Sequence, residues 1–167
     1  MSVIKPKFDT AGKAVTITLD SLASSKTDGR ESAVVDNTTD LYDFVTLHVL
    51  LKGANSGTIG NDKCVYVWAY EVPLDDDATP DDLYPGNVTG SDAAIAAIQE
   101  GALRYLGAIE FAEINTAYKK SFNLEVAFGG RVPRKWGVVL RNYTGIGLSA
   151  TGSDHALHYH GGWYEVA

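Results

Sequence analysis

Apolar and polar residues alternate along most of this chain, and the alternation predicts β-strands. A period of two places successive side chains on opposite sides of a strand, so that one side can be buried. The pattern begins at residues 15–19, where Val15, Ile17 and Leu19 are separated by threonines. It returns in six longer segments, which are residues 41–51, 64–72, 103–111, 118–128, 136–142 and 155–166. With a short pairing at Val34 and Val35, about eight strands are predicted.

The segment 64–72 is apolar on both sides, which is typical of a strand in the centre of a sheet. One side of it is aliphatic, and the other side is aromatic. The aromatic residues are Tyr66, Trp68 and Tyr70. In the later segment, Trp136 shares its side with Val138 and Leu140, so we predict that Trp136 packs in the core.

Turn residues separate most of these segments, as expected for strands joined by hairpins and short loops. The one helix that we predict covers residues 92–99, because Ser91 can cap it and alanines are good helix formers. The predicted fold is therefore all-β: an antiparallel β-sandwich, jelly-roll-like, with one short helix in a long loop. We expect residues 1–13 to form an irregular arm and residues 14–167 to form a single domain.

The composition narrows the range of partners. The chain has 167 residues and a net charge of −7, so we expect neither nucleic acid nor an anionic membrane as a partner. It has a single cysteine, Cys64, which excludes an internal disulfide and a zinc site built on paired cysteines. Residues 1–8 lack the apolar run of a secretion signal, so we expect synthesis in a cytoplasm.

Two histidines are candidate metal ligands. Gly152, His158, His160 and Glu165 have the spacing of the first metal motif of cupins. In a strand, His158 and His160 point to the same side, but Glu165 points to the other unless a bulge intervenes. No second histidine motif follows in the sequence. We therefore expect no metal and no other cofactor here, and the cupin-like metalloenzyme remains the least favoured alternative.

A proline-punctuated acidic stretch covers residues 73–92. Its first aspartates are Asp75, Asp76 and Asp77, and Asp81 and Asp82 follow. Carboxylates are the ligands that calcium prefers, but the glycine and terminal glutamate of an EF-hand loop are missing. We predict a solvated loop whose charge faces basic groups on a partner. Calcium binding is the alternative.

The remaining chemistry favours binding over catalysis. Exposed aromatic residues can stack on sugars, so Trp68 or Trp163 would serve a carbohydrate-binding module if the fold left them accessible. Cys64 lies within a predicted strand and is expected to pack as a small apolar residue. The sequence contains neither a Gly-x-Ser-x-Gly elbow nor a phosphate-binding glycine-rich loop. We therefore predict that the protein is not an enzyme.

Several short segments between residues 29 and 150 resemble, in combination, a group of small virion structural proteins of tailed bacteriophages. They are Gly29-Arg30-Glu31-Ser32, Val35-Asp36-Asn37, Leu41-Tyr42, Phe128-Gly129-Gly130, Pro133, Trp136-Gly137-Val138-Val139 and Asn142-Tyr143-Thr144-Gly145. The resemblance implies a β-sandwich that assembles on a phage particle, as a head decoration (cement) protein does.

The function expected from this resemblance is that of a capsid decoration subunit, which is made in the bacterial host cytoplasm and located in the virion. Its partners would be copies of itself, as a homo-oligomer, and other virion proteins such as the major capsid protein. We expect the contacts to involve the arm, with Lys5 and Lys7, and the acidic loop, with Asp75, Asp76 and Asp77. A carbohydrate-binding module of a fibre or adhesin is the first alternative.

Overall fold

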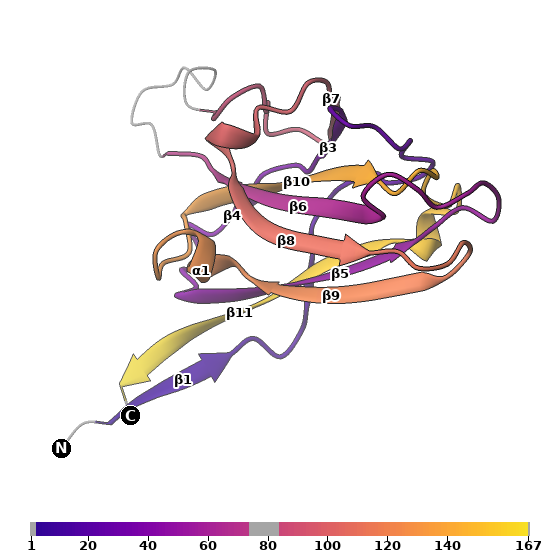
Figure 1. Cartoon of the computed structure of the whole chain (residues 1–167). Helices are drawn as coiled ribbons and strands as arrows, with labels where there is room; N and C mark the ends of the chain where they lie inside the picture. The colour runs from indigo at the N-terminus through magenta and orange to yellow at the C-terminus, as the bar shows by residue number, and fades with distance from the viewer. Residues whose placement is uncertain (1–2, 74–83, 167) are drawn as a thin grey trace.

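The computed structural model describes residues 3–73 and 84–166, which form two antiparallel β-sheets packed against each other (Figure 1). The first sheet has the strand order β1-β11-β5-β9, and β2 also pairs with β11. Its strands are β1 Ile4–Phe8, β2 Lys13–Ala14, β5 Phe44–Lys52, β9 Ala117–Asn123 and β11 Ala156–Val166. The predicted β-sandwich is confirmed.

The second sheet has the strand order β7-β3-β10-β6-β8, and β4 also pairs with β10. Its strands are β3 Gly29–Glu31, β4 Val35–Asp36, β6 Cys64–Glu71, β7 Ala93–Ile95, β8 Arg104–Glu110 and β10 Lys135–Tyr143. The central position predicted for residues 64–72 is correct, because β6 lies between β10 and β8.

No helix in the described residues is both long and apolar enough to span a bilayer.

The order of the strands is that of a jelly roll. The first strands, β1 and β2, lie beside the last strand, β11, while β3 and β4 lie beside the penultimate strand, β10. In the first sheet β5 and β9 follow β11, and in the second sheet β6 and β8 follow β10. This topology brings the two ends of the chain together in neighbouring strands of one sheet.

The main core lies between the two sheets. In β5, the side chains alternate between buried and half-buried, and the buried ones point toward the other sheet. They are Val45, Leu47, Val49 and Leu51. Trp136 of β10 is fully buried and meets the ring of Tyr159 from β11 edge to face, with 5.3 Å between the ring centroids. The prediction that Trp136 is a core residue is confirmed.

A second apolar cluster lies on the outer side of the second sheet, under described residues between 84 and 103. It consists of Trp68, Tyr70, Val72, Val88, Ile95, Leu103 and Val139. The buried carboxylate of Glu31 holds this covering segment by accepting the backbone N–H groups of Thr89 (2.8 Å) and Gly90 (3.2 Å). Burial raises the pKa of Asp92, but the hydrogen bonds it accepts, first that of Arg30, lower the pKa below its ordinary value.

The helix predicted over residues 92–99 is wrong. Ala93–Ile95 forms strand β7, antiparallel to β3, and the short 3-10 helix Glu100–Ala102 follows. The helix propensity of alanine is worth less than about 1 kcal/mol per residue, whereas β7 pairs with β3 and buries Ile95 in the outer cluster. A second 3-10 helix covers Gly152–Asp154.

The strand predicted over residues 118–128 is too long. Strand β9 ends at Asn123, and Leu124–Ala127 forms α1, the one α-helix of the described residues. The alternation continued into the helix because Leu124 is buried, but Val126 is 74% exposed. The short turn of α1 lets the Glu125 carboxylate accept the backbone N–H of Val45 at 3.1 Å.

Residues 15–19 alternate in burial without forming a strand. The N–H of Val15 donates to the carbonyl of Leu157 in the first sheet, while the carbonyl of Thr16 accepts the N–H of Ala33, which follows β3 of the second sheet. The segment therefore crosses from one sheet to the other and belongs to neither ladder. Its alternation arises because Val15 and Leu19 face the core.

Strand β8 does not keep one alternation along its whole length. Strict alternation would place Tyr105 on the same side as Ile109 and Phe111, both of which are buried. The ladder between β6 and β8 shifts register at Val67 and Trp68, opposite Gly107, whose φ is +147°. A bulge of this kind reverses which side of the strand each residue faces. Tyr105 therefore points outward from the sheet and is 55% exposed.

Candidate functional site: a ribbon formed by the two ends of the chain

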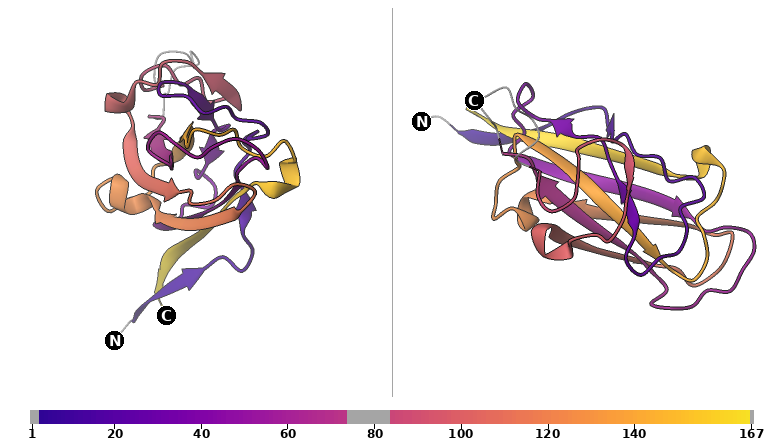
Figure 2. Two further views of the ribbon diagram at one scale, coloured as in Figure 1. Left: turned by 45° about the vertical axis from the view of Figure 1, so that its right-hand side comes forward. Right: turned by 90° about the horizontal axis from the view of Figure 1, so that it is seen from above.

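Strand β1 and the end of β11 form a two-stranded ribbon that projects from the sandwich and carries both ends of the chain (Figures 1 and 2). The paired residues run from Ile4 opposite Val166 to Phe8 opposite Gly162. We call residues 4–8 and 162–166 the terminal ribbon. The irregular structure expected for residues 1–13 is wrong for residues 4–8, because they pair with β11 throughout.

The terminal ribbon has two chemically different faces. Residues opposite each other in an antiparallel pair share a face, and the register therefore assigns every side chain. One face is apolar and consists of Ile4, Pro6, Phe8, Tyr164 and Val166. The other face carries Lys5, Lys7, Trp163 and Glu165. On this second face, Lys7 Nζ lies 3.1 Å from a carboxylate oxygen of Glu165.

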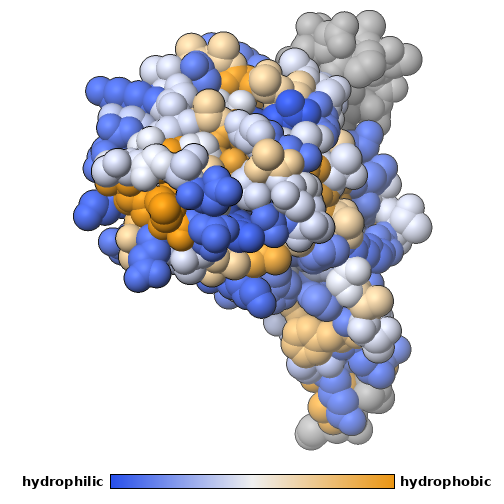
Figure 3. Space-filling view, turned by 90° about the vertical axis from the view of Figure 1, so that its right-hand side faces the viewer, coloured by the Kyte–Doolittle hydropathy of each residue, from blue (hydrophilic) through white to orange (hydrophobic). Residues whose placement is uncertain are grey.

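The apolar face of the ribbon is open to solvent. Its larger side chains are about two-thirds exposed: Ile4 67%, Phe8 65%, Tyr164 61% and Val166 67%. Of the ten large hydrophobic side chains exposed in the described residues, six belong to the ribbon or to Val3 beside it. Apolar patches are visible along the projection in Figure 3. Exposed apolar side chains gathered on one face in this way are typical of an interaction surface.

A groove of about 600 Å³ lies at the base of the apolar face. Its lining residues are Pro6, Phe8, Tyr42, Asp43, Phe44, Thr46, Asn123, Glu125, Gly130, Arg131, Val132 and Tyr164. Phe44 joins the ribbon to the sandwich, because its ring meets Phe8 and Tyr164 edge to face at centroid distances of 5.2 and 5.6 Å. The apolar face and the groove thus form one continuous surface.

Two glycines fix the base of the ribbon. The ring of Tyr42 lies on Gly161, and the ring of Phe44 lies on Gly162, so closely that a Cβ atom at either glycine would come within 2.3 Å of the ring. Strand β11 runs through both glycines without a break in register. They permit close packing of aromatic rings on the strand, as glycine does where nothing larger fits.

Polar contacts hold the same base from the other side. The Tyr42 hydroxyl donates to the Asp9 carboxylate, and this hydrogen bond lowers the pKa of Asp9. Lys13 Nζ lies 2.7 Å from Asp40 Oδ2 and 5.1 Å from the centroid of the Tyr42 ring. Hydrogen bonds with Asp40 and then Tyr42 raise the pKa of Lys13. Asp9 and Lys13 therefore stay ionised at neutral pH, and their contacts anchor the chain where it leaves the ribbon.

The candidate histidines lie away from the ribbon, on the outer side of the first sheet. His158 lies opposite His48 of β5, and the rings of His48 and His160 meet edge to face at 5.2 Å. The sequence pattern does not identify His48, because only the pairing of β5 with β11 brings it beside these histidines. Strand β11 keeps its register from Ala156 to Val166, so Glu165 faces the other side, as predicted. Within the described ranges, no three His, Cys, Asp or Glu side chains are placed to hold a metal ion.

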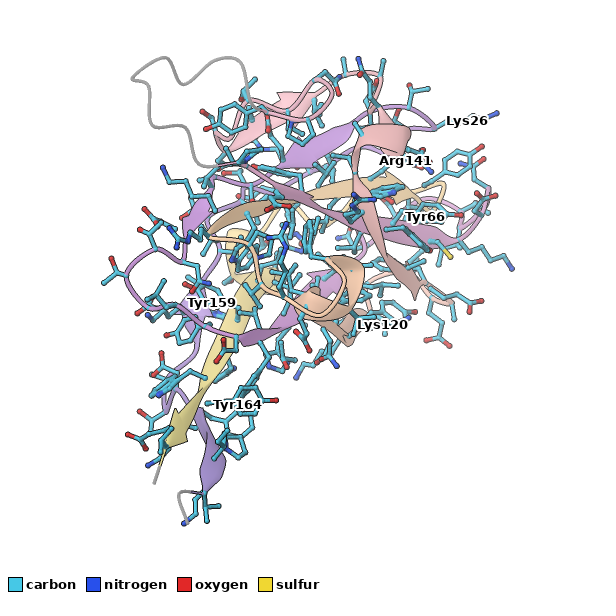
Figure 4. All side chains as sticks on the ribbon, turned by 90° about the vertical axis from the view of Figure 1, so that its left-hand side faces the viewer. Lys26, Tyr66, Lys120, Arg141, Tyr159 and Tyr164 are labelled. Carbon is cyan, nitrogen blue, oxygen red and sulfur yellow. The ribbon has the colours of Figure 1, made fainter. Side chains whose placement is uncertain are left out.

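The aromatic side of β6 divides into a covered part and an open part. Trp68, a predicted sugar-stacking residue, is only 4% exposed. Beside it, the rings of Tyr66 and Tyr105 remain accessible, and the Arg141 guanidinium stacks on Tyr66 and Trp68 at 4.9 and 5.0 Å. Figure 4 shows Tyr66 and Arg141 next to each other on this outer surface. A hydrogen bond to Asp62, together with burial, raises the pKa of Tyr66 to about 12.

Cys64 lies away from the ribbon, in the second sheet. Cys64 is half-buried at the start of β6, and burial, followed by the charge of Glu110, raises the pKa of its thiol. The thiol therefore stays protonated at neutral pH and is not an activated nucleophile. Asp75, Asp76 and Asp77 lie outside the described residues, and so do Asp81 and Asp82.

No protein-family model matches the chain, and a search of curated proteins finds no match.

Proposed function

We propose that this chain is a structural subunit that acts by binding protein neighbours, and that it is a virion protein of a tailed bacteriophage, as a capsid decoration subunit. The observation that carries the proposal is the exposed apolar face of the terminal ribbon. A two-stranded ribbon is at best marginally stable alone in water. A ribbon that holds half of its side chains as exposed apolar groups is expected to be covered in the assembled state.

The resemblance to phage virion proteins supports the same proposal through the fold. The resembling segments contain Ser32, Asn37, Trp136 and Asn142, all of which are buried. The Asn37 side chain makes hydrogen bonds with the backbone of Tyr42 and with that of Pro133. These two residues belong to two other resembling segments. The residues of the resembling segments thus build the sandwich that presents the ribbon.

The test is binding to a capsid. Purified protein would be mixed with empty shells assembled from a major capsid protein encoded by the same genome, and the shells would be sedimented. We expect saturable binding of the wild-type chain, and a loss of at least about tenfold in affinity for a Phe8→Ser/Tyr164→Ser variant, because interface aromatics dominate binding energy. Val126→Ser is the matched control, since Val126 is exposed but lies outside the ribbon.

Two results would contradict the capsid proposal. Wild-type protein that stays in the supernatant at every concentration tested would exclude decoration of that shell. Equal binding of the wild-type chain and the double variant would show that the ribbon is not the contact surface. Because Phe8 and Tyr164 are solvent-exposed, the double variant is expected to fold, and circular dichroism checks this.

Carbohydrate binding is the second candidate function, and the surface around Tyr105 is the observation that favours it. The exposed ring of Tyr105 lies 5.9 Å from the ring of Trp68 and 6.4 Å from that of Tyr66. Arg141 is ion-paired with Glu100 at the edge of this cluster. An aromatic platform flanked by charged hydrogen-bonding groups has the chemistry to stack on a sugar ring and to bind its hydroxyls.

This second function predicts binding to an array of bacterial surface glycans. Tyr105→Ala is expected to abolish the signal, because it removes the most exposed ring of the platform. The Phe8→Ser/Tyr164→Ser variant should bind glycans like the wild-type chain, since the ribbon is on the other sheet. Absence of any glycan signal for the wild-type protein would reject this candidate and leave the capsid test unaffected.

A further inference from the structure

The outer side of the first sheet carries a basic face where β9, β5 and β11 lie next to one another (Figure 1). Residues in register across antiparallel strands share one side of the sheet. One row across these three strands consists of Ser121, His48 and His158, and the next row consists of Lys119, Leu50 and Ala156. We call these six residues the histidine face.

A groove of about 400 Å³ runs over the histidine face, and all six residues line it. Leu50 and Ala156 are half-buried and give the groove an apolar floor. His158 and Lys119 are exposed, on the strands that flank β5. The Ser121 hydroxyl lies 2.8 Å from His48 Nδ1, which leaves Nε2 as the ring nitrogen that can meet a ligand.

The lining of this groove is basic. It includes two lysines and two histidines, and no carboxylate is among its described residues. Lys120 is engaged elsewhere, because its Nζ donates to the carbonyl of Ala108 at 2.7 Å. Lys119 makes no ion pair within the described part of the chain, whereas the neighbouring Lys52 is neutralised by Asp154 at 3.2 Å. On a chain of net charge −7, this groove favours an anionic occupant.

The spacing of the basic groups favours an extended acidic peptide over a small ion. Lys119 and His158 lie on strands separated by β5 and in adjacent rows, so their backbones are about 12 Å apart. A single carboxylate or phosphate group is too small to contact both. In an extended chain, side chains four residues apart are separated by about 13 Å, with one side chain of the same face between them.

We propose that the histidine face binds an extended acidic segment of a neighbouring protein, in which two acidic side chains flank an apolar one at alternate positions. One carboxylate pairs with Lys119 and the other meets His158, while the apolar side chain lies on Leu50. This inference rests on the proposed function, that the chain binds protein neighbours, and names the chemistry of one neighbour. The terminal ribbon takes no part in this contact.

The experiment is a titration of the full-length protein with the capped peptide acetyl-Glu-Gly-Leu-Gly-Glu-amide, followed by the NMR signals of the backbone amides. We expect the signals of the histidine face to move, with a dissociation constant below about 1 mM. Lys119→Glu should raise that constant about fivefold, because it replaces an attraction with a repulsion. Lys26→Glu is the matched control, since it makes the same charge change at an exposed lysine beside the second sheet.

A change of pH tests whether the histidines take part. Histidine side chains gain charge between about pH 8 and pH 5, while the carboxylates of the peptide stay ionised above about pH 5. The groups that face His158 and His48 are His160 of the same strand, Lys119 of β9 and the uncharged Ala14 of β2. The wild-type chain should therefore bind the peptide more tightly at pH 6 than at pH 8, and His158→Asn should lose most of this gain.

Four results would overturn the proposal. They are unmoved signals on the histidine face at about 5 mM peptide, equal binding of a control peptide with glutamine in place of both glutamates, equal displacement of the peptide by inorganic phosphate at matched ionic strength, and an affinity that does not rise from pH 8 to pH 6. If the peptide fails while capsid shells still bind through Phe8 and Tyr164, only this neighbour is rejected. If the shells fail as well, the proposed function is rejected with it.

Discussion

Replacing Trp136 with alanine is expected to lower the free energy of unfolding by about 3–5 kcal/mol, the usual cost of truncating a buried aromatic residue. Trp136 is fully buried and packs edge to face on Tyr159, which belongs to the other sheet. It also lies in β10, paired with Val35 on one side and Glu71 on the other. Its removal would therefore open a cavity at the point where the two sheets meet.

The measurement is the urea denaturation midpoint of Trp136→Ala beside that of Trp163→Ala. Trp163 is 37% exposed in the ribbon, so its replacement should cost much less. Trp136→Phe is a further comparison, which keeps a buried aromatic ring but removes the indole N–H. That N–H is buried and has no acceptor among the described residues, so its removal breaks no hydrogen bond. A midpoint for Trp136→Ala equal to that of the wild-type chain would contradict the core assignment.

The long strands of the sandwich were predictable because each has one side in the core. Alternation in β5, β6, β10 and β11 follows directly from that geometry, and those four strands form the middle of the two sheets. The fold class and the burial of Trp136 follow from the same pattern. Prediction failed where local preference and long-range pairing disagree. The alanines at 93–94 favour a helix locally, but they pair with β3, more than 60 residues earlier in the chain.

The ribbon was harder to predict than the sandwich. Residues 4–8 do alternate, because Lys5 and Lys7 separate the apolar residues Ile4, Pro6 and Phe8, but the lysines and the proline favour an irregular segment. What makes it a strand is the end of β11, which lies more than 150 residues away in the chain. The apolar face exists only once those two short segments are in register.

The same limit applies to the other surfaces. His48 joins His158 and His160 only through the pairing of β5 with β11. Tyr105 faces outward only because of the bulge at Gly107. Period-two reasoning assigns sides within one strand, so it cannot place residues of different strands together, and it fails beyond a bulge.

Asn142→Ala is the second substitution with a large expected effect. Asn142 is fully buried at the end of β10, and its amide nitrogen donates to the carbonyls of Leu22 (2.9 Å) and Ile146 (2.7 Å). Its amide oxygen accepts the backbone N–H of Thr144 at 3.2 Å and the hydroxyl of Thr144 at 2.7 Å. One side chain thus satisfies the turn after β10 and the segment that precedes β3.

Alanine at position 142 would leave several of those buried groups without partners, and each such group costs about 1–3 kcal/mol. We therefore expect the free energy of unfolding to fall by about 3 kcal/mol or more, read from the urea midpoint. Asn55→Ala, at an exposed position, should change it little. Asn142→Asp keeps the acceptor for Thr144 but buries a carboxylate oxygen against the carbonyls of Leu22 and Ile146, which is itself destabilising. A loss smaller than that of alanine would therefore identify the hydrogen bonds accepted from Thr144 as the dominant ones.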